Sequence, residues 1–413
     1  MRYGLAHVRP AINFWRQHGT VSFLYLVNRK LFQKNGSFVI KHLLPKNDVL
    51  DTYAFLNVLP TTDGTRLNSS DNRTINWFVP MYGRGSGGHL NIFRFIFLLE
   101  KLGFQSNVIL VNLPGHTAPS ADQAKKEISE WFFPLKSQVI VGLRNIPPAF
   151  FSFATSWQTA YLVKKITETK YKCYFVQDYE PWFYSHGSDY ALALATYGFG
   201  FLGVTAGQWL ATKLAVEHGM VTCPIGFSYD ASLYRPMPRR EPQIKRVFFY
   251  ARPPTTRRGF EIGLLALHSV AEKIPELEVC FAGWDVSDYE IPFKHKNAGM
   301  LKLHELPDIY NQCDVALVLS FSNLSLLPLE IMACGTSVVC NKGANNEWLL
   351  TEHNSRLVEP SVDSIAAAIV ALLENPEQRE LLKLGGLATA AKNNSWEHEA
   401  EKLATFLNSN SAL

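Results

Sequence analysis

The chain has 413 residues, about two to three times the usual size of one domain, and this length predicts two hydrophobic cores. Hydrophobic residues make up 47% and charged residues 18%, as in ordinary globular proteins, which excludes a disordered or fibrous chain. The formal net charge of +4 is small for this length and does not indicate a nucleic-acid partner. The six cysteines show no CxxC or other metal-ligand spacing, so we expect reduced thiols and no metal site.

The beginning of the chain is basic. Met1–Asn47 contains eight Lys or Arg residues and no Asp or Glu, with aromatic residues between them. Such a segment can lie on an anionic membrane surface, or it can pack on the first domain with its cations in water, and both interpretations are open. Met1–Gly19 lacks the continuous apolar run of a secretory leader, so we expect a cytoplasmic protein, and a peripheral contact to the inner face of the membrane is the first of these two open interpretations.

The first half of the chain predicts an α/β domain. The strand INWFVPM (75–81) is followed by a glycine-rich turn, YGRGSGGH (82–89), a helix (91–103) and the strand NVILV (107–111), which together make a βαβ unit. Further strands are expected at 138–143, 172–178 and 201–207. Helix-like segments separate them, so we expect a largely parallel sheet.

The second half repeats this alternation after a linker rich in Pro and Arg at 234–243. The expected strands are 246–252, 278–284, 300–304, 315–320 and 337–341, and the expected helices include 259–274, 306–313 and 325–335. The fold class is therefore α/β, with two doubly wound Rossmann-like domains that face a cleft. We expect an N-terminal extension at 1–75, an acceptor-side domain at 76–240, a donor domain at 241–395 and, at 396–413, a helix that crosses back to the first domain.

Two patterns near residue 200 are misleading. Between Asp189 and Lys213 there is no formal charge, but the glycines in this stretch predict a turn, a strand and a helix start instead of a membrane span. GFGFLG (198–203) satisfies G-x-G-x-x-G, yet it precedes a strand and so is not a dinucleotide fingerprint.

Glu330 is the most unusual residue of the second half. It is the single charged residue between Asp314 and Lys342, in a strongly apolar stretch, so its carboxylate needs a partner. Ser325 is placed to cap the helix that carries Glu330, and the N-terminus of that helix would attract a phosphate. A carboxylate there suits ribose hydroxyls, but pairing with a buried Arg or capping a neighbouring backbone explains Glu330 equally well.

The stretch from Ser322 to Val339 reads S-x7-E-x-M-A-C-G-x-x-V-V and resembles the signature of family 4 retaining glycosyltransferases with the GT-B fold. The segments 223–236 and 250–259 resemble two further motifs of that family. The basic N-terminus and VQDYEPWF (176–183) resemble the WsaF-type rhamnosyltransferases, which build bacterial cell-surface and S-layer glycans from dTDP-rhamnose.

The resemblance implies a donor site. Glu330 would bind the ribose, and Arg252 and Arg258 would clamp the diphosphate and stabilise the charge that develops as the glycosidic bond breaks. Lys302 is a candidate third cation, or an ordinary exposed lysine. Further donor-binding candidates are Gly87, Gly88 and His89 at the glycine turn, Gly283, Trp284 and Leu303 around the base, and Asn323, Ser325 and Leu326 before the helix.

On the acceptor side, Asp178 ends a strand and is expected to orient the acceptor hydroxyl, with Tyr179, Glu180 and Trp182 as further candidates. The family has a Glu where this chain has Ser322, so a carboxylate that helps to read the donor sugar is missing, which is compatible with a 6-deoxy sugar. No D-x-D carboxylate pair is present, because Asp178–Glu180 reads DYE. We therefore expect transfer without a metal or other cofactor.

The resemblance thus implies a retaining rhamnosyltransferase that moves rhamnose from dTDP-rhamnose to a lipid-linked glycan. Three alternatives are open: a transferase of UDP- or GDP-hexoses, a GT-B sugar-nucleotide epimerase, and a non-catalytic glycan-binding subunit. An epimerase would need acid and base groups in the cleft, for which Asp178, Glu180 and His89 are the candidates.

Overall fold

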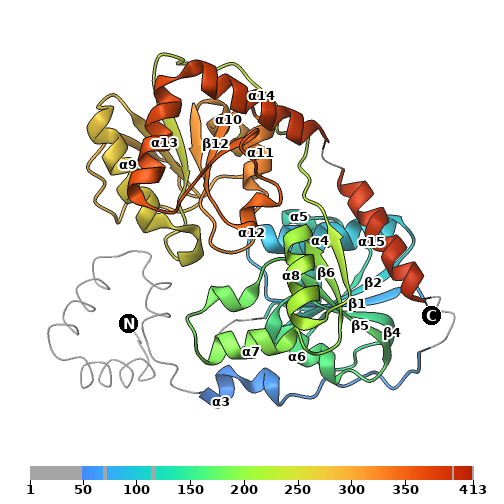
Figure 1. The fold of residues 1–413 in the computed structure, drawn as a ribbon. Helices are drawn as coiled ribbons and strands as arrows, with labels where there is room; N and C mark the ends of the chain where they lie inside the picture. Colours follow the sequence, from blue (N-terminus) through green and yellow to red (C-terminus); the bar gives the residue numbers. More distant parts are fainter. Residues whose placement is uncertain (1–48, 68–71, 113–117, 393–394, 412–413) are drawn as a thin grey trace, which may run out of the picture. The chain divides into compact units, whose positions relative to one another are not determined.

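The computed structural model describes residues 49–67, 72–112, 118–392 and 395–411, and it divides the chain into a unit that ends at Val58 and a unit from Leu59 to Leu413. The described end of the first unit holds α3 (Val49–Thr52) and η2 (Ala54–Leu56). The basic segment 1–47 lies outside the described residues, so both interpretations of it stay predictions. The second unit contains two parallel sheets (Figure 1).

The first sheet has seven strands in the order β3-β2-β1-β4-β5-β6-β7, and all neighbouring pairs are parallel. Its strands are β1 (Thr74–Pro80), β2 (Gln105–Val111), β3 (Gln138–Val141), β4 (Ala149–Ala154), β5 (Thr169–Val176), β6 (Leu202–Ala206) and β7 (Thr222–Ile225). Its helices are α4 (Gly87–Lys101), α5 (Ala121–Trp131), α6 (Trp157–Lys165), α7 (Ser188–Thr196) and α8 (Gln208–His218). The sequence analysis did not predict β4, AFFSFA, although every residue of this central strand is buried.

The second sheet has six parallel strands in the order β10-β9-β8-β11-β12-β13. Its strands are β8 (Arg246–Tyr250), β9 (Glu278–Ala282), β10 (His295–Asn297), β11 (Val315–Leu317), β12 (Ser337–Asn341) and β13 (Ser355–Val358). Its helices are α9 (Phe260–Lys273), α10 (Leu306–Asn311), α11 (Leu327–Ala333), α12 (Ala344–Glu347), α13 (Val362–Glu374) and α14 (Pro376–Lys392).

The predicted strand at 300–304 is wrong. Gly299 turns the chain in the left-handed region, with φ +59°, and the Glu305 carboxylate accepts the N–H of Lys302 at 2.7 Å. The turn and the hydrogen bond start the short helix η5 (Leu303–Glu305) instead of a strand. The edge strand of this sheet is β10, which lies earlier in the chain.

Alternation along the strands explains the two-sided packing of the second sheet. Phe249 points to the core that contains α9 and α13, whereas the adjacent Phe248 belongs to the core that contains α10 and α11. Both sheets therefore carry helices on their faces, and the prediction of two doubly wound domains is confirmed.

The last helix, α15 (Trp396–Ser411), contributes to the core of the first sheet. Leu403 and Leu407 are fully buried in the same cluster as Trp77 of β1. The charge-free stretch near residue 200 forms parts of α7, β6 and α8. Within the described ranges, none of the helices has the length and apolar character that crossing a bilayer requires.

Candidate functional site

The carboxyl end of the second sheet carries Glu330 in the first turn of α11. The cap expected from Ser325 is wrong: the N-cap residue is Leu326, which makes no side-chain capping bond. Ser325 Oγ is instead buried without a hydrogen-bond partner in this part of the structure. The start of α11 therefore has no side-chain cap, and the Ser325 hydroxyl near it makes no hydrogen bond within the described residues.

Burial raises the pKa of the Glu330 carboxyl to about 7, and the positive charge of Arg94 and the nearby Tyr234 hydroxyl offset part of this rise. Arg94 lies on α4, donates to Asn91 Oδ1 at 2.7 Å and lies over the Trp396 ring at 4.2 Å. Among the described residues, no Arg94–Glu330 ion pair forms within 4.0 Å. Arg94 therefore lies close enough for its charge to lower the pKa of Glu330, but the two residues do not form the direct ion pair that the alternative predicted.

Two tyrosines beside Glu330 also have unused hydrogen-bonding groups. The rings of Tyr234 and Tyr310 are stacked with centroids 6.2 Å apart, and both are almost fully buried. In the described part of the chain, neither hydroxyl has a partner at hydrogen-bond distance and angle, although the Tyr234 hydroxyl lies close enough to Glu330 to lower the pKa of that carboxyl. Burial and the Glu330 charge raise the pKa of each phenol, so both hydroxyls are neutral donors at neutral pH. A buried polar group without a partner costs free energy, which favours a polar ligand here.

The two predicted diphosphate arginines have different surroundings. Arg252 Nη1 donates to Gly283 O at 3.2 Å and lies 3.9 Å from Met300 Sδ, and its guanidinium lies 5.8 Å from the Trp284 ring centroid. The structure therefore brings Arg252, Gly283 and Trp284 together, and their donor roles stay predictions. Arg258 instead donates to Ser320 Oγ and, at 3.4 Å, to Asn323 O.

Gly259 ends the short helix η4 (Thr256–Arg258) and allows this arrangement. Its φ is +59°, and a Cβ there would meet the Phe321 ring at 2.9 Å, so only glycine fits between Arg258 and α9.

Sequence reasoning missed Arg257. Its guanidinium lies 3.7 Å from the Phe183 ring centroid, and its Nε lies 3.6 Å from Asp178 Oδ2. Burial lowers the pKa of Arg257, and the Asp178 charge opposes that change. The adjacent arginines in TRRG were a visible signal, but the sequence could not show which of the two faces the first sheet.

Asp178 follows β5 and connects the two sheets. Its carboxylate accepts the N–H of Tyr179 at 2.8 Å, the N–H of Asn323 at 2.7 Å and the Ser322 hydroxyl at 2.8 Å. Asn323 Nδ2 donates to Gln177 O at 3.1 Å and to Ala206 O at 2.7 Å. These bonds hold the turn after β11, and the expected acceptor contact of Asp178 stays a prediction.

Glu180, a further acceptor-side candidate, is also held in the protein. It is 8% exposed, and it accepts the Tyr174 hydroxyl and, at 2.9 Å, the N–H of Trp157 at the start of α6. These bonds occupy both of its oxygens. Glu180 thus fixes the loop after β5.

The glycine turn after β1 leads into α4, with Ser86 as N-cap. His89 Nε2 lies 3.3 Å from Pro80 O and Nδ1 lies 2.8 Å from Ser86 Oγ, so both ring nitrogens have protein partners. Burial lowers the pKa of His89 to about 4, and the ring is neutral at pH 7. His89 therefore holds the turn and adds no cation for a diphosphate.

The glycines of this turn differ in what the protein around them requires. Gly85 has φ +78° and requires glycine for its backbone. A Cβ on Gly87 would meet nothing within 4 Å, and one on Gly88 would make an ordinary contact with Gln177 at 3.5 Å. The protein itself leaves room at both positions.

Lys302 and Leu303 are exposed at η5, and only the backbone of Lys302 takes part in the bond to Glu305.

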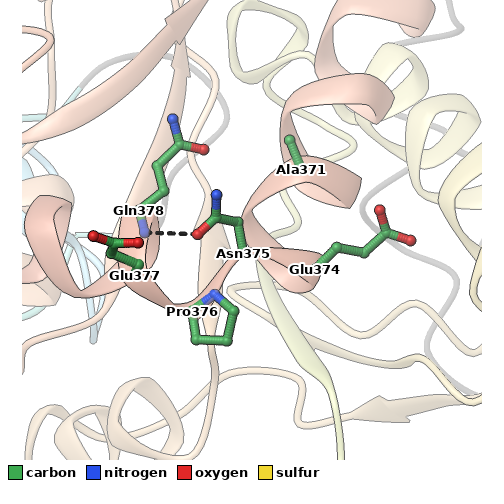
Figure 2. Close-up of a pocket in the computed structure, with 6 residues that line it drawn as sticks. All are labelled: Ala371, Glu374, Asn375, Pro376, Glu377 and Gln378. Carbon is green, nitrogen blue, oxygen red and sulfur yellow. Dashed lines mark hydrogen bonds between the residues drawn. The ribbon is translucent and has the colours of Figure 1, made fainter.

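A surface hollow lies elsewhere, where α13 meets α14, and Figure 2 shows its lining. The lining includes the carboxylates Glu374 and Glu377 and no cation, so the hollow does not suit a diphosphate. Among the described residues, no group of three His, Cys, Asp or Glu side chains could hold a metal ion.

Comparison with known proteins supports the resemblance. The model of the WsaF C-terminal domain family matches residues 245–370. Over 344 residues, 80% of this chain, the sequence is 35% identical to the O-antigen biosynthesis protein RfbC of Myxococcus xanthus, and it spans 26% of the length of that protein.

Solved structures share the fold. Sucrose-phosphate synthase from Thermosynechococcus elongatus is similar with a TM-score of 0.64 at 13% identity, over 82% of this chain and 99% of that chain. The Anabaena protein HepE, solved with UDP and glucose, has a TM-score of 0.63 at 16% identity, over 81% of this chain and 99% of that chain. The predicted GT-B fold is confirmed. By family model and relative, the chain is similar to the WsaF-type glycosyltransferases, and its fold is GT-B.

Proposed function

We propose that this protein is a glycosyltransferase that takes a sugar from a nucleotide-sugar donor and adds it to a growing bacterial surface glycan. The observation behind the proposal is the partly buried Glu330 carboxylate at the start of α11, whose pKa burial raises to about 7. A UDP donor offers its 2′ and 3′ ribose hydroxyls to the Glu330 carboxylate and a dTDP donor offers its single free 3′ hydroxyl, whereas an apolar ligand would leave the carboxylate unpaired. The WsaF family model and the O-antigen biosynthesis relative support the glycan as the product.

For the donor we propose dTDP-rhamnose, with retention at the anomeric carbon. The support for rhamnose is the resemblance of the basic N-terminus and of 176–183 to WsaF-type rhamnosyltransferases, together with Ser322 in place of a sugar-reading Glu, and the support for retention is the family 4 signature at 322–339. A UDP-hexose is the second candidate, because HepE was solved with UDP and glucose and with UDP-glucose. UDP carries a ribose, whereas dTDP carries a 2′-deoxyribose and a 5-methyl group on its base, so the two donors offer Glu330 two hydroxyls or one.

In the proposed reaction, Arg252 and Arg258 neutralise the diphosphate as the bond from the anomeric carbon to the phosphate oxygen breaks. The departing phosphate oxygen takes the proton of the acceptor hydroxyl on the face from which it leaves, and the acceptor oxygen forms the new glycosidic bond. These cations supply the charge stabilisation that a metal ion supplies in other transferases, so the proposal includes no metal cofactor.

We further propose that the acceptor is lipid-linked and that the protein works at the cytoplasmic face of the membrane. The basic, aromatic segment 1–47 supports this placement through its charge.

The test is incubation of the full chain with dTDP-rhamnose, UDP-glucose or GDP-mannose, with and without a membrane fraction of the source organism. We expect labelled rhamnose to enter glycan with the anomeric configuration of the donor. Transfer from UDP-glucose alone would replace the donor assignment. Conversion of a donor without acceptor would indicate an epimerase, and absence of both transfer and nucleotide binding would contradict the proposed function.

A further inference from the structure

Two tryptophans meet at the carboxyl edge of the first sheet. Trp182 lies in the short helix η3 (Glu180–Phe183), which follows β5, and Trp209 is the second residue of α8, which follows β6. Because β5 and β6 are neighbouring parallel strands, their following segments lie at the same edge (Figure 1). The two indole rings are 5.7 Å apart between centroids and are tilted by 37°.

Trp182 is unusually accessible for its residue type. It is 39% exposed, and of the tryptophans within the described ranges it is the only exposed one. Trp209 is partly buried beside it. An indole of this size on a surface leaves a large apolar area in water, and such areas are often binding sites.

The ring of Trp182 is held from within the protein. The buried Tyr179 ring meets it edge-on at 5.0 Å and stacks in turn on Tyr197 at 5.4 Å. Lys213 Nζ lies 5.0 Å from the Trp182 ring centroid and pairs with Glu217 at 2.7 Å. A ring fixed in this way loses little conformational entropy when a ligand stacks on it.

The same short helix reaches the donor residues. Phe183 follows Trp182 directly, and the Arg257 guanidinium lies 3.7 Å from its ring centroid. Arg257 precedes Arg258, one of the two diphosphate arginines. A ligand on Trp182 would therefore lie next to Phe183, whose contact with Arg257 links η3 to the residues assigned to the donor.

We propose that Trp182 and Trp209 form a stacking platform for a neutral pyranose ring of the acceptor glycan. This inference rests on the proposed function and names the acceptor subsite of the same reaction. An aromatic face is electron-rich, and the C–H groups on one face of a pyranose are polarised positive, so the two attract without formal charge. The nearest cation, Lys213, is neutralised by Glu217, so the platform lacks the net positive charge that would draw it to an anionic membrane.

The test follows the indole N–H signals of the wild-type chain by NMR, with Trp182→Phe and Trp209→Phe used to assign the two signals. The probes are methyl α-L-rhamnopyranoside and methyl α-D-glucopyranoside, with sorbitol as a polyol that has no ring face. We expect the pyranosides to shift the Trp182 and Trp209 signals and sorbitol to leave them unchanged. No pyranoside shift, equal shifts with sorbitol, or shifts only with vesicles of anionic phospholipid would overturn the platform.

Kinetics separate this inference from the proposed function. Trp182→Ala should raise the acceptor KM about tenfold and leave the affinity for the donor nucleotide unchanged. Leu265→Ala, an exposed apolar residue on α9, is the matched control and should change neither value. Loss of nucleotide affinity in Trp182→Ala would contradict an acceptor role, and an unchanged acceptor KM would contradict stacking, while transfer itself persists in both cases.

Discussion

Asp178 Oδ1 accepts the backbone N–H of Asn323 at 2.7 Å, although the two residues are 145 positions apart in the sequence. The other oxygen accepts the hydroxyl of Ser322, the residue that stands where the related transferases have a Glu. A carboxylate is therefore present at this turn, but it comes from the loop after β5. The turn after β11 and the first sheet are joined through this group.

Asp178→Asn should weaken that connection. Asparagine keeps one acceptor oxygen, but its amide nitrogen can only donate, so the bond that Asp178 Oδ2 accepts from the Ser322 hydroxyl is lost, and the side chain carries no charge to face Arg257. We expect a loss of about 1–3 kcal/mol in the free energy of unfolding, measured with urea, because a buried hydrogen bond is left unmade.

The control is Asp308→Asn, which removes an exposed pair with Arg240 at 2.8 Å and should leave the urea midpoint close to that of the wild type. If Asp178→Asn and Asp308→Asn have the same urea midpoint, the Asp178 bonds do not stabilise the protein.

Glu180 should make stability depend on pH. Burial raises its pKa from 4.5 to about 7, with hydrogen bonds from Tyr174 and Trp157 offsetting part of the rise. Between these two values the folded protein binds more protons than the unfolded chain, so the free energy of unfolding falls as pH rises from 4.5 to 7. Glu180→Gln should reduce this slope in urea unfolding at successive pH values.

Glu330 has a raised pKa in the same window, so the comparison is made in the Glu330→Gln background, where Glu180 contributes alone. An identical slope with and without Glu180 would show that this carboxyl is not protonated in the folded protein near pH 6.

Two glycines give opposite expectations for the same substitution. Gly263 lies inside α9, where a Cβ would come 2.2 Å from Phe249 Cζ, so Gly263→Ala should destabilise by about 1–3 kcal/mol through overpacking. Gly88 lies in the first turn of α4 with its nearest neighbour at 3.5 Å, so Gly88→Ala should be neutral or stabilise by up to about 1 kcal/mol. Thermal unfolding of the two variants measures both changes in stability. A lower melting temperature for Gly88→Ala would contradict the open space found around Gly88.

Local patterns predicted most of the fold. The βαβ alternation, the two sheets and the helix that carries Glu330 followed from apolar runs of the right length and from glycine turns. The strand AFFSFA was missed because it follows β3 after a short loop, with no helix between them to mark a new strand. The strand predicted at 300–304 failed because one glycine turn and one Glu305 bond outweighed its alternation.

The site was predictable only where a residue was conspicuous along the chain. Glu330 was isolated in an apolar stretch, and Arg252 lay in a recognisable motif. Arg94 near Glu330, Asp178 at Asn323 and Arg257 at Phe183 all join distant segments, and no local pattern records such contacts. For the same reason, the sequence could not show that the nitrogens of His89 and the oxygens of Glu180 are occupied within the protein.

Calorimetric titration of dTDP and UDP at pH 6, 7 and 8 tests whether Glu330 binds the sugar of the donor nucleoside. With a carboxyl pKa of about 7, the affinity of the wild type should rise across this range as Glu330 loses its proton. Glu330→Gln should bind about 10- to 100-fold more weakly at pH 8, with a smaller pH dependence, because a charged hydrogen-bond acceptor is lost. Glu352→Gln, at an exposed position, should behave as the wild type. Wild-type affinity and pH dependence in Glu330→Gln would contradict the ribose assignment.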